Sequence, residues 1–304
     1  GEAGSGPPSQ SIIADLYPPE KRASAMAIYS LGVLLGGGLG IMIGGNVAHA
    51  YGWRAAMMVV GIPGVLLALI VRFVVVEPRR GLSDVQRVAE EEEHPLPSMW
   101  HGFLHMLRNG PAVYLVCGIM LTSLVGYALT GWGPSYMQRS LGMSMLQVAN
   151  YIALPAALTA AASALIGGAM ADRMAKKHGL HAQPWVIATM KTIAFPFAVA
   201  FYFFDSIPVA LAAYFLSTLF AGAYIGPTYA LIQHLAPLRL RAMWAALALL
   251  FTNLVGLGLG PLAVGRLSDA LAPTYGADSL RYAMFAVAML TPVPIWCYWR
   301  AGVL

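Results

Sequence analysis

The chain has 304 residues, of which 59% are apolar and only 10% are charged, and its formal net charge is +5 at pH 7. About a quarter of the residues of an average soluble domain are charged, so this composition excludes an ordinary soluble protein and predicts a protein of the bilayer. The basic residues stand at the ends of apolar segments rather than along one face, which argues against a nucleic-acid-binding surface.

The apolar residues fall into nine blocks separated by short polar turns. A helix crosses about 30 Å of hydrocarbon at about 1.5 Å per residue, and membrane-spanning strands would instead give alternating blocks of about ten residues. We therefore expect an all-α integral membrane protein. The nine blocks are 1–17, 23–50, 54–76, 111–137, 144–170, 183–204, 207–235, 241–264 and 281–300.

Two segments resemble each other at an offset of 219 residues. Residues 8–37 and 227–256 are identical at ten of thirty positions, including a Pro-x-x-x-Arg-Ala turn at 18–23 and 237–242. Parallel repeats of this kind are an established transporter architecture. The copies occupy the first and second and the seventh and eighth blocks, which predicts two six-helix halves. Nine spans, the fourth to the twelfth, would be present here, and three would precede Gly1 in a complete protein.

This arithmetic divides the chain into three parts. Residues 1–76 would be the last three spans of the N-terminal bundle, and residues 109–304 the C-terminal six-helix bundle. Residues 77–108 form the longest polar segment and would be the cytoplasmic linker, with a short amphipathic helix around Met99 to Met106 on the membrane surface. We expect the acidic run at 90–93 to be solvated.

Basic residues predict the orientation. Cytoplasmic loops carry an excess of lysine and arginine, so we expect the richer end to be cytoplasmic, in the cell (inner) membrane, with the C-terminus inside. The richer end would hold Lys21, Arg22, Arg79, Arg80, Arg87, Arg108, Arg173, Lys176, Lys177, Arg239, Arg241 and Arg300, and the other end Arg54, Arg139, Arg266 and Arg281.

The segment G-A-M-A-D-R-M-A-K-K closes one long apolar block. It contains Gly168, Asp172, Arg173, Lys176 and Lys177. This spacing resembles the signature loop of the major facilitator superfamily, G-x-x-x-D-[RK]-x-x-[RK]-[RK]. The resemblance implies a major facilitator fold, in which this loop is a cytoplasmic latch between neighbouring helices. For the lysines alone, an ordinary positive-inside loop is the alternative.

The first residues narrow the resemblance. Gly1-Glu2-Ala3, the segment I-I-A-D-L-Y at 12–17 and then Arg22 are similar to the fourth helix of Spinster-type lysolipid transporters. The resemblance implies that interhelix salt bridges of Asp15, Arg22 and Arg241 hold the outward-open state; plain interfacial anchoring is the alternative. Organic anion:cation symporters also carry an E-A pair in this helix but lack the I-I-A-D-L sequence.

Glu2 is the candidate proton-coupling residue. Helical rise places it about 20 Å from Leu16 and Tyr17, in the outer half of the bilayer, where a carboxylate needs water or a partner. Desolvation there disfavours the charged form, as proton coupling requires, and the Spinster resemblance implies the same role. The alternative is a structural carboxylate paired with an arginine from a span that precedes Gly1.

Several polar and aromatic residues inside the blocks could line a substrate cavity. Lys191 could bind an anionic head group, although a lysine that snorkels to the interface is more common. The candidates are Tyr127, Thr130, Trp132, Lys191, Gln233, Thr252 and Asn253.

No catalytic or metal-binding motif is found in the sequence. Cys117 and Cys297 lie in apolar blocks, and His49 and His234 have no second ligand at metal spacing, so we expect no metal, no cofactor and no enzyme activity. The sequence predicts a proton-coupled secondary transporter of an amphiphilic solute such as a lysophospholipid or sphingolipid, monomeric in the bilayer. The alternatives are an organic-anion symporter or multidrug exporter and, from another class, a non-transporting membrane receptor or scaffold.

Overall fold

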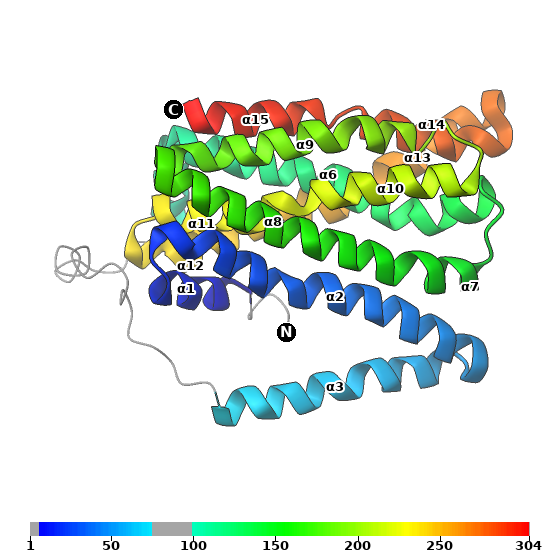
Figure 1. The fold of residues 1–304 in the computed structure, drawn as a ribbon, viewed down its shortest axis with the longest axis horizontal. Coiled ribbons are helices and arrows are strands. Elements are labelled where there is room, and N and C mark those ends of the chain that lie inside the picture. The colour runs from blue at the N-terminus through cyan, green and yellow to red at the C-terminus, as the bar shows by residue number, and fades with distance from the viewer. Residues whose placement is uncertain (1–5, 75–98, 304) are drawn as a thin grey trace.

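The computed structural model describes residues 6–74 and 99–303, and every regular element in these two stretches is helical. Figure 1 shows the long helices lying side by side along the length of one elongated bundle. The prediction of an all-α protein is confirmed. Because a helix satisfies its own backbone hydrogen bonds, it is the element that can expose an apolar surface to lipid.

The longer helices follow the predicted blocks in chain order. They are α1 (Gly6–Leu16), α2 (Pro19–Tyr51), α3 (Trp53–Val74), α5 (Met99–Arg108), α6 (Gly110–Arg139), α8 (Leu154–His178), α9 (Gln183–Ala200), α10 (Ile207–Ala221), α11 (Ile225–Leu235), α12 (Arg241–Phe251), α13 (Gly260–Tyr275), α14 (Ser279–Ala288) and α15 (Pro292–Val303). Between them lie α7 (Met145–Gln147), the π-helices η2 (Val148–Ala153) and η6 (Thr252–Leu259), and the 3₁₀ segments η3 (Leu180–Ala182), η4 (Gly222–Tyr224), η5 (Leu238–Leu240) and η7 (Gly276–Asp278).

Six helical runs in the described stretches are long and apolar enough to cross a membrane. The last of them contains the two final predicted blocks. The two remaining blocks correspond to α1, with 11 described residues, and to α9, whose 18 residues include a lysine. The runs are Pro19–Tyr51, Trp53–Val74, Gly110–Arg139, Met145–His178, Ile207–Leu235 and Leu238–Val303.

Local sequence signals explain where several helices begin and end. Gly52 ends α2 with a φ of 84° and Gly179 ends α8 with a φ of 91°, in the left-handed region that only glycine adopts readily. The side chain of Asn109 accepts a hydrogen bond from the backbone of Ala112 and thereby caps the first turn of α6.

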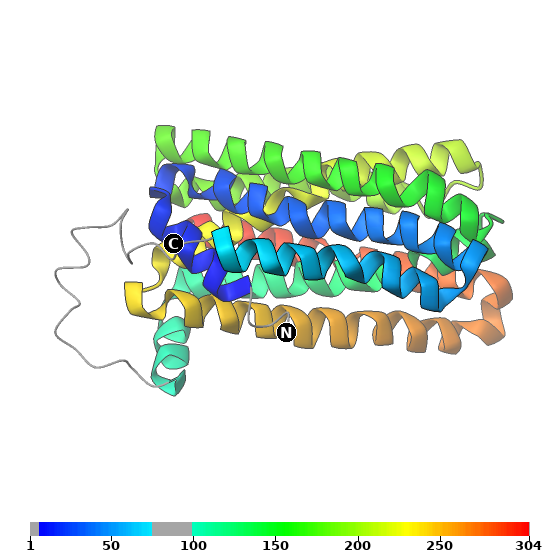
Figure 2. The same ribbon diagram turned by 90° about the horizontal axis from the view of Figure 1, so that it is seen from below.

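One predicted block boundary is wrong, and two predicted blocks are interrupted. The eighth block continues beyond residue 264 to Tyr275, because Arg266 and Asp269 are exposed and stay solvated on a helix that extends past the apolar layer. Figure 2 shows α12, η6 and α13 as one continuous run. A turn immediately before Pro292 breaks the ninth block, and η4 interrupts the seventh.

The helix expected near Met99 is confirmed as α5, but it also packs against the bundle. Its Phe103 ring lies 6.2 Å from the ring of Phe251 in α12, and its Met106 is buried. Among the described residues, α5 is the part of the predicted linker that can be compared. The division into residues 1–76, 77–108 and 109–304 stays a prediction.

The N-terminal helices share a core with the later helices at one end of the bundle. Ala14, Ala23 and Met26 belong to the same buried cluster as Trp244 and Tyr298. We call this end, which holds the turns at residues 17–18 and 236–237, the latch end. By contrast, α3 has no buried residue and folds back beside α2, as Figure 1 shows.

Candidate functional site

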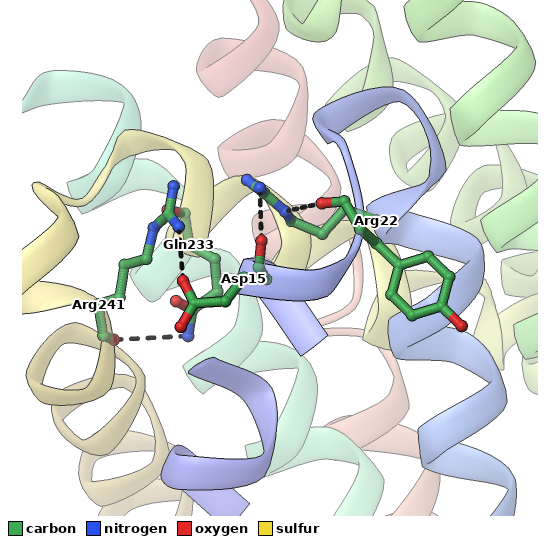
Figure 3. Close-up of polar contacts among 6 residues, drawn as sticks. Asp15, Arg22, Gln233 and Arg241 are labelled. Carbon is green, nitrogen blue, oxygen red and sulfur yellow. Dashed lines mark hydrogen bonds and ion pairs between the residues drawn. The ribbon is translucent and has the colours of Figure 1, made fainter. Parts of the chain in front are cut away.

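Arg241 connects the two parts of the chain at the latch end. Its side chain is 1% exposed, and its Nη1 donates to Asp15 Oδ1 at 3.3 Å, from α12 to α1. Its Nε donates to the carbonyl oxygen of Gln233 at 3.0 Å, and the Gln233 amide donates back to the Arg241 carbonyl at 3.4 Å. Figure 3 shows that the guanidinium lies between the α1 carboxylate and the end of α11.

Arg22 closes the turn between α1 and α2. It is fully buried; its Nη2 donates to the carbonyl oxygen of Ala14 at 2.7 Å and its Nε to that of Tyr17 at 3.2 Å (Figure 3). The last carbonyl groups of a helix have no partner within the helix, so a buried helix end needs a donor of this kind. We call Asp15, Arg22, Gln233 and Arg241 the latch.

The two arginines occupy equivalent positions in the predicted repeat. The offset of 219 residues relates Arg22 to Arg241, and it also relates the carbonyls they bind, those of Ala14 and Gln233. The prolines of the two turns are both extended, with ψ of 156° at Pro18 and 146° at Pro237. The turn and its arginine contact are thus repeated in three dimensions as well as in sequence.

A seam of small residues lies next to the latch, where α8 and α11 approach α2. A Cβ atom added at Gly168 would lie 2.9 Å from Ala27 Cβ, and one added at Gly226 would lie 2.5 Å from the carbonyl oxygen of Ala23. Side chains at either position would separate these helices. We call Ala23, Ala27, Gly168 and Gly226 the seam.

Asp172 binds the start of α2 from the signature segment. Its Oδ2 accepts a hydrogen bond from the backbone nitrogen of Ser24 at 3.0 Å. Ser24 is the sixth residue of α2, so this hydrogen bond joins the end of α8 to the second turn of α2. With Gly168 one helical turn earlier, the predicted spacing brings both residues against α2.

Two of the three basic residues of the signature segment lie beside this contact. Arg173 and Lys176 are exposed and line a cleft of 370 Å³ that Ser24 and Asp172 also line, while Lys177 is exposed and does not line it. Their predicted part in a latch therefore stays a prediction.

The predicted cavity residues separate into different environments. Tyr127 and Thr130 are exposed on α6, Thr252 is buried and Asn253 half-buried in η6. Trp132 donates from Nε1 to the carbonyl oxygen of Pro261 at 2.9 Å and thereby joins α6 to α13. The structure places Gln233 in the latch rather than in a cavity, because its side chain and carbonyl both bind Arg241.

Lys191 lies among tyrosines that the sequence analysis did not single out. Its side chain is buried, and its Nζ lies 4.5 Å from the centroid of the Tyr224 ring. The hydroxyl of Thr228 donates to the carbonyl oxygen of Tyr224 at 2.6 Å and lies 3.2 Å from the hydroxyl of Tyr298. Tyr224 and Thr228 lie on either side of a Gly226-Pro227 pair, the signal in the sequence that could have identified them.

Two further predictions concern Glu2 and metal binding. Glu2 lies outside the described residues. Within the described stretches, no group of three or more histidine, cysteine, aspartate or glutamate side chains could hold a metal ion.

Apolar runs long enough to span a membrane, a structural repeat and a charged contact between its copies define a multi-pass membrane protein built from related halves. The chain belongs to the Major Facilitator Superfamily, whose family model matches residues 1–261. Members of this superfamily are transporters rather than enzymes. The fold class and the family predicted from the signature segment are confirmed.

Individual relatives place the chain near two groups of the superfamily. It is 30% identical over 303 residues to an MFS-type efflux pump of Mycolicibacterium smegmatis. It is 31% identical over 143 residues to protein spinster homolog 1 of Xenopus laevis. The matched parts are 99% and 46% of this chain, and 68% and 26% of the respective relatives.

Solved structures agree with this placement. A bacterial homologue of the human lysosomal transporter Spinster, in an inward-facing and unoccupied conformation, superposes with a TM-score of 0.69 at 25% identity. The match covers 99% of this chain and 75% of that one. The E. coli fucose:proton symporter superposes with a TM-score of 0.64 at 15% identity, over 97% of this chain and 73% of that one, and shows the common fold alone.

Proposed function

We propose that this chain is the larger part of a secondary transporter that moves an amphiphilic organic solute by alternating access. The observation that carries the proposal is the Arg241–Asp15 ion pair, which joins helices 226 positions apart in a fold of the Major Facilitator Superfamily. Alternating access in such folds is the movement of one half against the other around a central site.

The latch and the seam are suited to a contact that opens and closes. Taking two charges out of water costs free energy that their attraction only partly returns, so a buried pair contributes less to stability than its geometry implies. Small residues let helix backbones meet closely in lipid without interlocking side chains. Contacts of this kind favour one packed arrangement of the halves and still allow another.

A second contact lies far from the latch end. Asn46 of α2 donates from Nδ2 to Oδ1 of Asn150 in η2 at 2.7 Å, and Asn150 donates back at 3.4 Å. The consecutive helices η2 and α8 are therefore joined to α2 at two distant points, by Asn46–Asn150 and by Ser24–Asp172. In the proposed alternating-access cycle, the Asn46–Asn150 contact weakens in one state and the Ser24–Asp172 contact in the other.

The substrate class rests on similarity to Spinster proteins together with the tyrosine-rich surroundings of Lys191. Aromatic side chains with hydroxyl groups offer both an apolar surface and hydrogen bonds, as an amphiphile needs. Proton coupling through Glu2 is part of the proposal and rests on the position of an acid within the first predicted span.

We also propose that the latch end faces the cytoplasm of the cell (inner) membrane. Within residues 6–74 and 99–303, the helix ends on this side carry most of the lysine and arginine, as the positive-inside rule requires. A cysteine introduced at Lys177 should react with an impermeant maleimide only after the membrane is opened, in a background where Cys117 and Cys297 are replaced by alanine. Reaction in intact cells would reverse the orientation.

A multidrug exporter is the second candidate function. The similarity to the mycobacterial efflux pump is 30% identity over 303 residues, whereas the spinster homolog 1 of Xenopus tropicalis is 26% identical over 312 residues. Drug export would use the same latch and seam with a different cavity.

The deciding experiment uses the full-length protein in proteoliposomes with an imposed pH gradient. Uptake of a labelled lysophospholipid is followed for the wild type and for Glu2→Gln. Gradient-driven flux that the variant loses supports both the lipid substrate and the coupling residue. Unchanged flux and pH dependence in Glu2→Gln would withdraw the coupling role. If the wild type moves only drugs, the exporter is correct; if it moves neither lipids, drugs nor organic anions, a receptor or scaffold is favoured.

A further inference from the structure

Lys191 is a buried basic residue with little compensation for its burial. It is 5% exposed, and its described interaction is with the face of the Tyr224 ring, 4.5 Å from Nζ. Within residues 6–74 and 99–303 the ion pairs described are Arg241–Asp15 and Arg281–Asp205, neither of which involves this lysine. A cation–π contact returns only part of the free energy that burying an ammonium costs. Among the described residues, the ammonium therefore has an aromatic partner and no described carboxylate partner.

The tyrosine that covers this ammonium belongs to a group of hydroxyl-bearing side chains. Tyr224 interacts with Ser123 and Tyr127 of α6, while Thr228 donates to the Tyr224 carbonyl oxygen and lies 3.2 Å from the Tyr298 hydroxyl. A cation next to tyrosine and serine hydroxyls matches the charge and hydrogen-bonding capacity of a phosphate or carboxylate. Lys191 is eight residues into α9, about 12 Å from its start.

The Tyr224 ring that covers Lys191 belongs to a break between two helices. Tyr224 is the last residue of η4, the 3₁₀ segment that separates α10 from α11. Such a segment within a helix often marks a functional hinge. Tyr127 is 38% exposed, so the group of hydroxyls extends from an exposed position to the buried lysine.

We propose that Lys191, covered by Tyr224, is the subsite for the anionic head group of the transported amphiphile, a phosphate or carboxylate. This inference rests on the proposed function and specifies the charge of its substrate. The exposed fraction of Lys191 argues against a lysine that snorkels to the interface. A protein that keeps a buried lysine for function gives up some stability of its folded state. Thermal unfolding therefore tests the inference independently of transport.

The test measures ligand-dependent thermal unfolding of the purified full-length protein in nanodiscs. The probes are dodecyl phosphate, inorganic phosphate, dodecanol and dodecylamine, and the variants are Lys191→Met and, as a matched control at an exposed lysine, Lys21→Met. Dodecyl phosphate should stabilise the wild type and Lys21→Met, and its affinity for Lys191→Met should fall at least about tenfold, or about 1.4 kcal/mol. Dodecanol should bind all three alike. Without ligand, Lys191→Met should unfold at a higher temperature than the wild type.

Several results would overturn the inference. Undiminished binding of dodecyl phosphate to Lys191→Met would exclude the subsite, and a lower unfolding temperature of that variant without ligand would indicate a structural lysine. Equal stabilisation by inorganic phosphate would assign the site to a free anion rather than to a head group. If Lys191→Met does not fold, the wild type still decides, because dodecylamine binding as tightly as dodecyl phosphate contradicts an anion site. If dodecyl phosphate binding depends on Lys191 but the protein transports no solute, the anion subsite is supported and the proposed transport function is rejected.

Discussion

Arg22 and Arg241 stand 219 positions apart, and each donates a hydrogen bond to the carbonyl oxygen eight residues before it, at Ala14 and Gln233 respectively. The equivalence extends to the prolines of the two turns and to the preceding helix ends, Leu16 of α1 and Leu235 of α11. In addition, Arg241 reaches Asp15 in the other copy. The same local turn thus closes a helix end in both copies, and in the second copy it also joins α12 to α1.

Removal of the Asp15 carboxylate should open the latch end. In Asp15→Asn, a buried guanidinium loses its counter-ion, so the free energy of unfolding should fall by about 3 kcal/mol. Cysteines placed along α8 near Asp172 should also react faster with a maleimide. The control is Asp205→Asn, which breaks the Arg281 ion pair at a carboxylate that is 86% exposed and should cost at most about 1 kcal/mol. Equal effects of the two substitutions would show that the latch is no stronger than a surface pair.

A methyl group in the seam should separate α11 from α2. Gly226→Ala would place a Cβ 2.5 Å from the carbonyl oxygen of Ala23, and overpacking of this kind costs about 1–3 kcal/mol. The thermal midpoint in detergent measures the effect. Gly37→Ala is the matched control, because nothing lies within 4 Å of its new Cβ and alanine is the better helix former by about 0.5–1 kcal/mol. The seam has no role in packing if both variants are stabilised.

The amides of Asn46 and Asn150 should be coupled energetically. Alanine at either position removes the reciprocal pair, so the double variant should be less destabilised than the sum of the single variants by about 0.5–1 kcal/mol. Asn46→Ala should lose more on its own, because its amide also donates to the carbonyl oxygen of Met42. Thermal unfolding of the four proteins gives the coupling, and strict additivity would mean that the two side chains do not stabilise each other.

Replacement of either latch arginine by lysine should destabilise the protein. Each guanidinium bonds two different groups through Nε and Nη, which a single ammonium cannot reach together, so Arg22→Lys and Arg241→Lys should each lose about 1–3 kcal/mol. Arg139→Lys, at an exposed position, should be neutral. Accessibility of the latch end to a maleimide should rise more in Arg241→Lys, because only this substitution weakens the contact with Asp15. The equivalence of the two turns is refuted if Arg22→Lys unfolds as the wild type does.

Much of the architecture was accessible from the sequence because membrane helices are determined by local composition. Apolar runs predicted the helices, and glycine with positive φ ended α2 and α8. The offset of 219 residues predicted a repeated turn that the structure contains. The interruption at η4 was missed, since it lies in apolar sequence where hydropathy does not change.

A helical membrane protein with a repeated Pro-Arg turn and a signature segment could be predicted from the sequence, because those properties depend on hydrophobic length and on contacts between residues close in the chain. Which side chains meet follows from the packing of the helices. Gln233 could have faced a cavity but lies against Arg241, and Lys191 could have reached the interface but lies against Tyr224. Such partners come from helices far apart in sequence, and their packing, not their composition, determines where a polar side chain is satisfied.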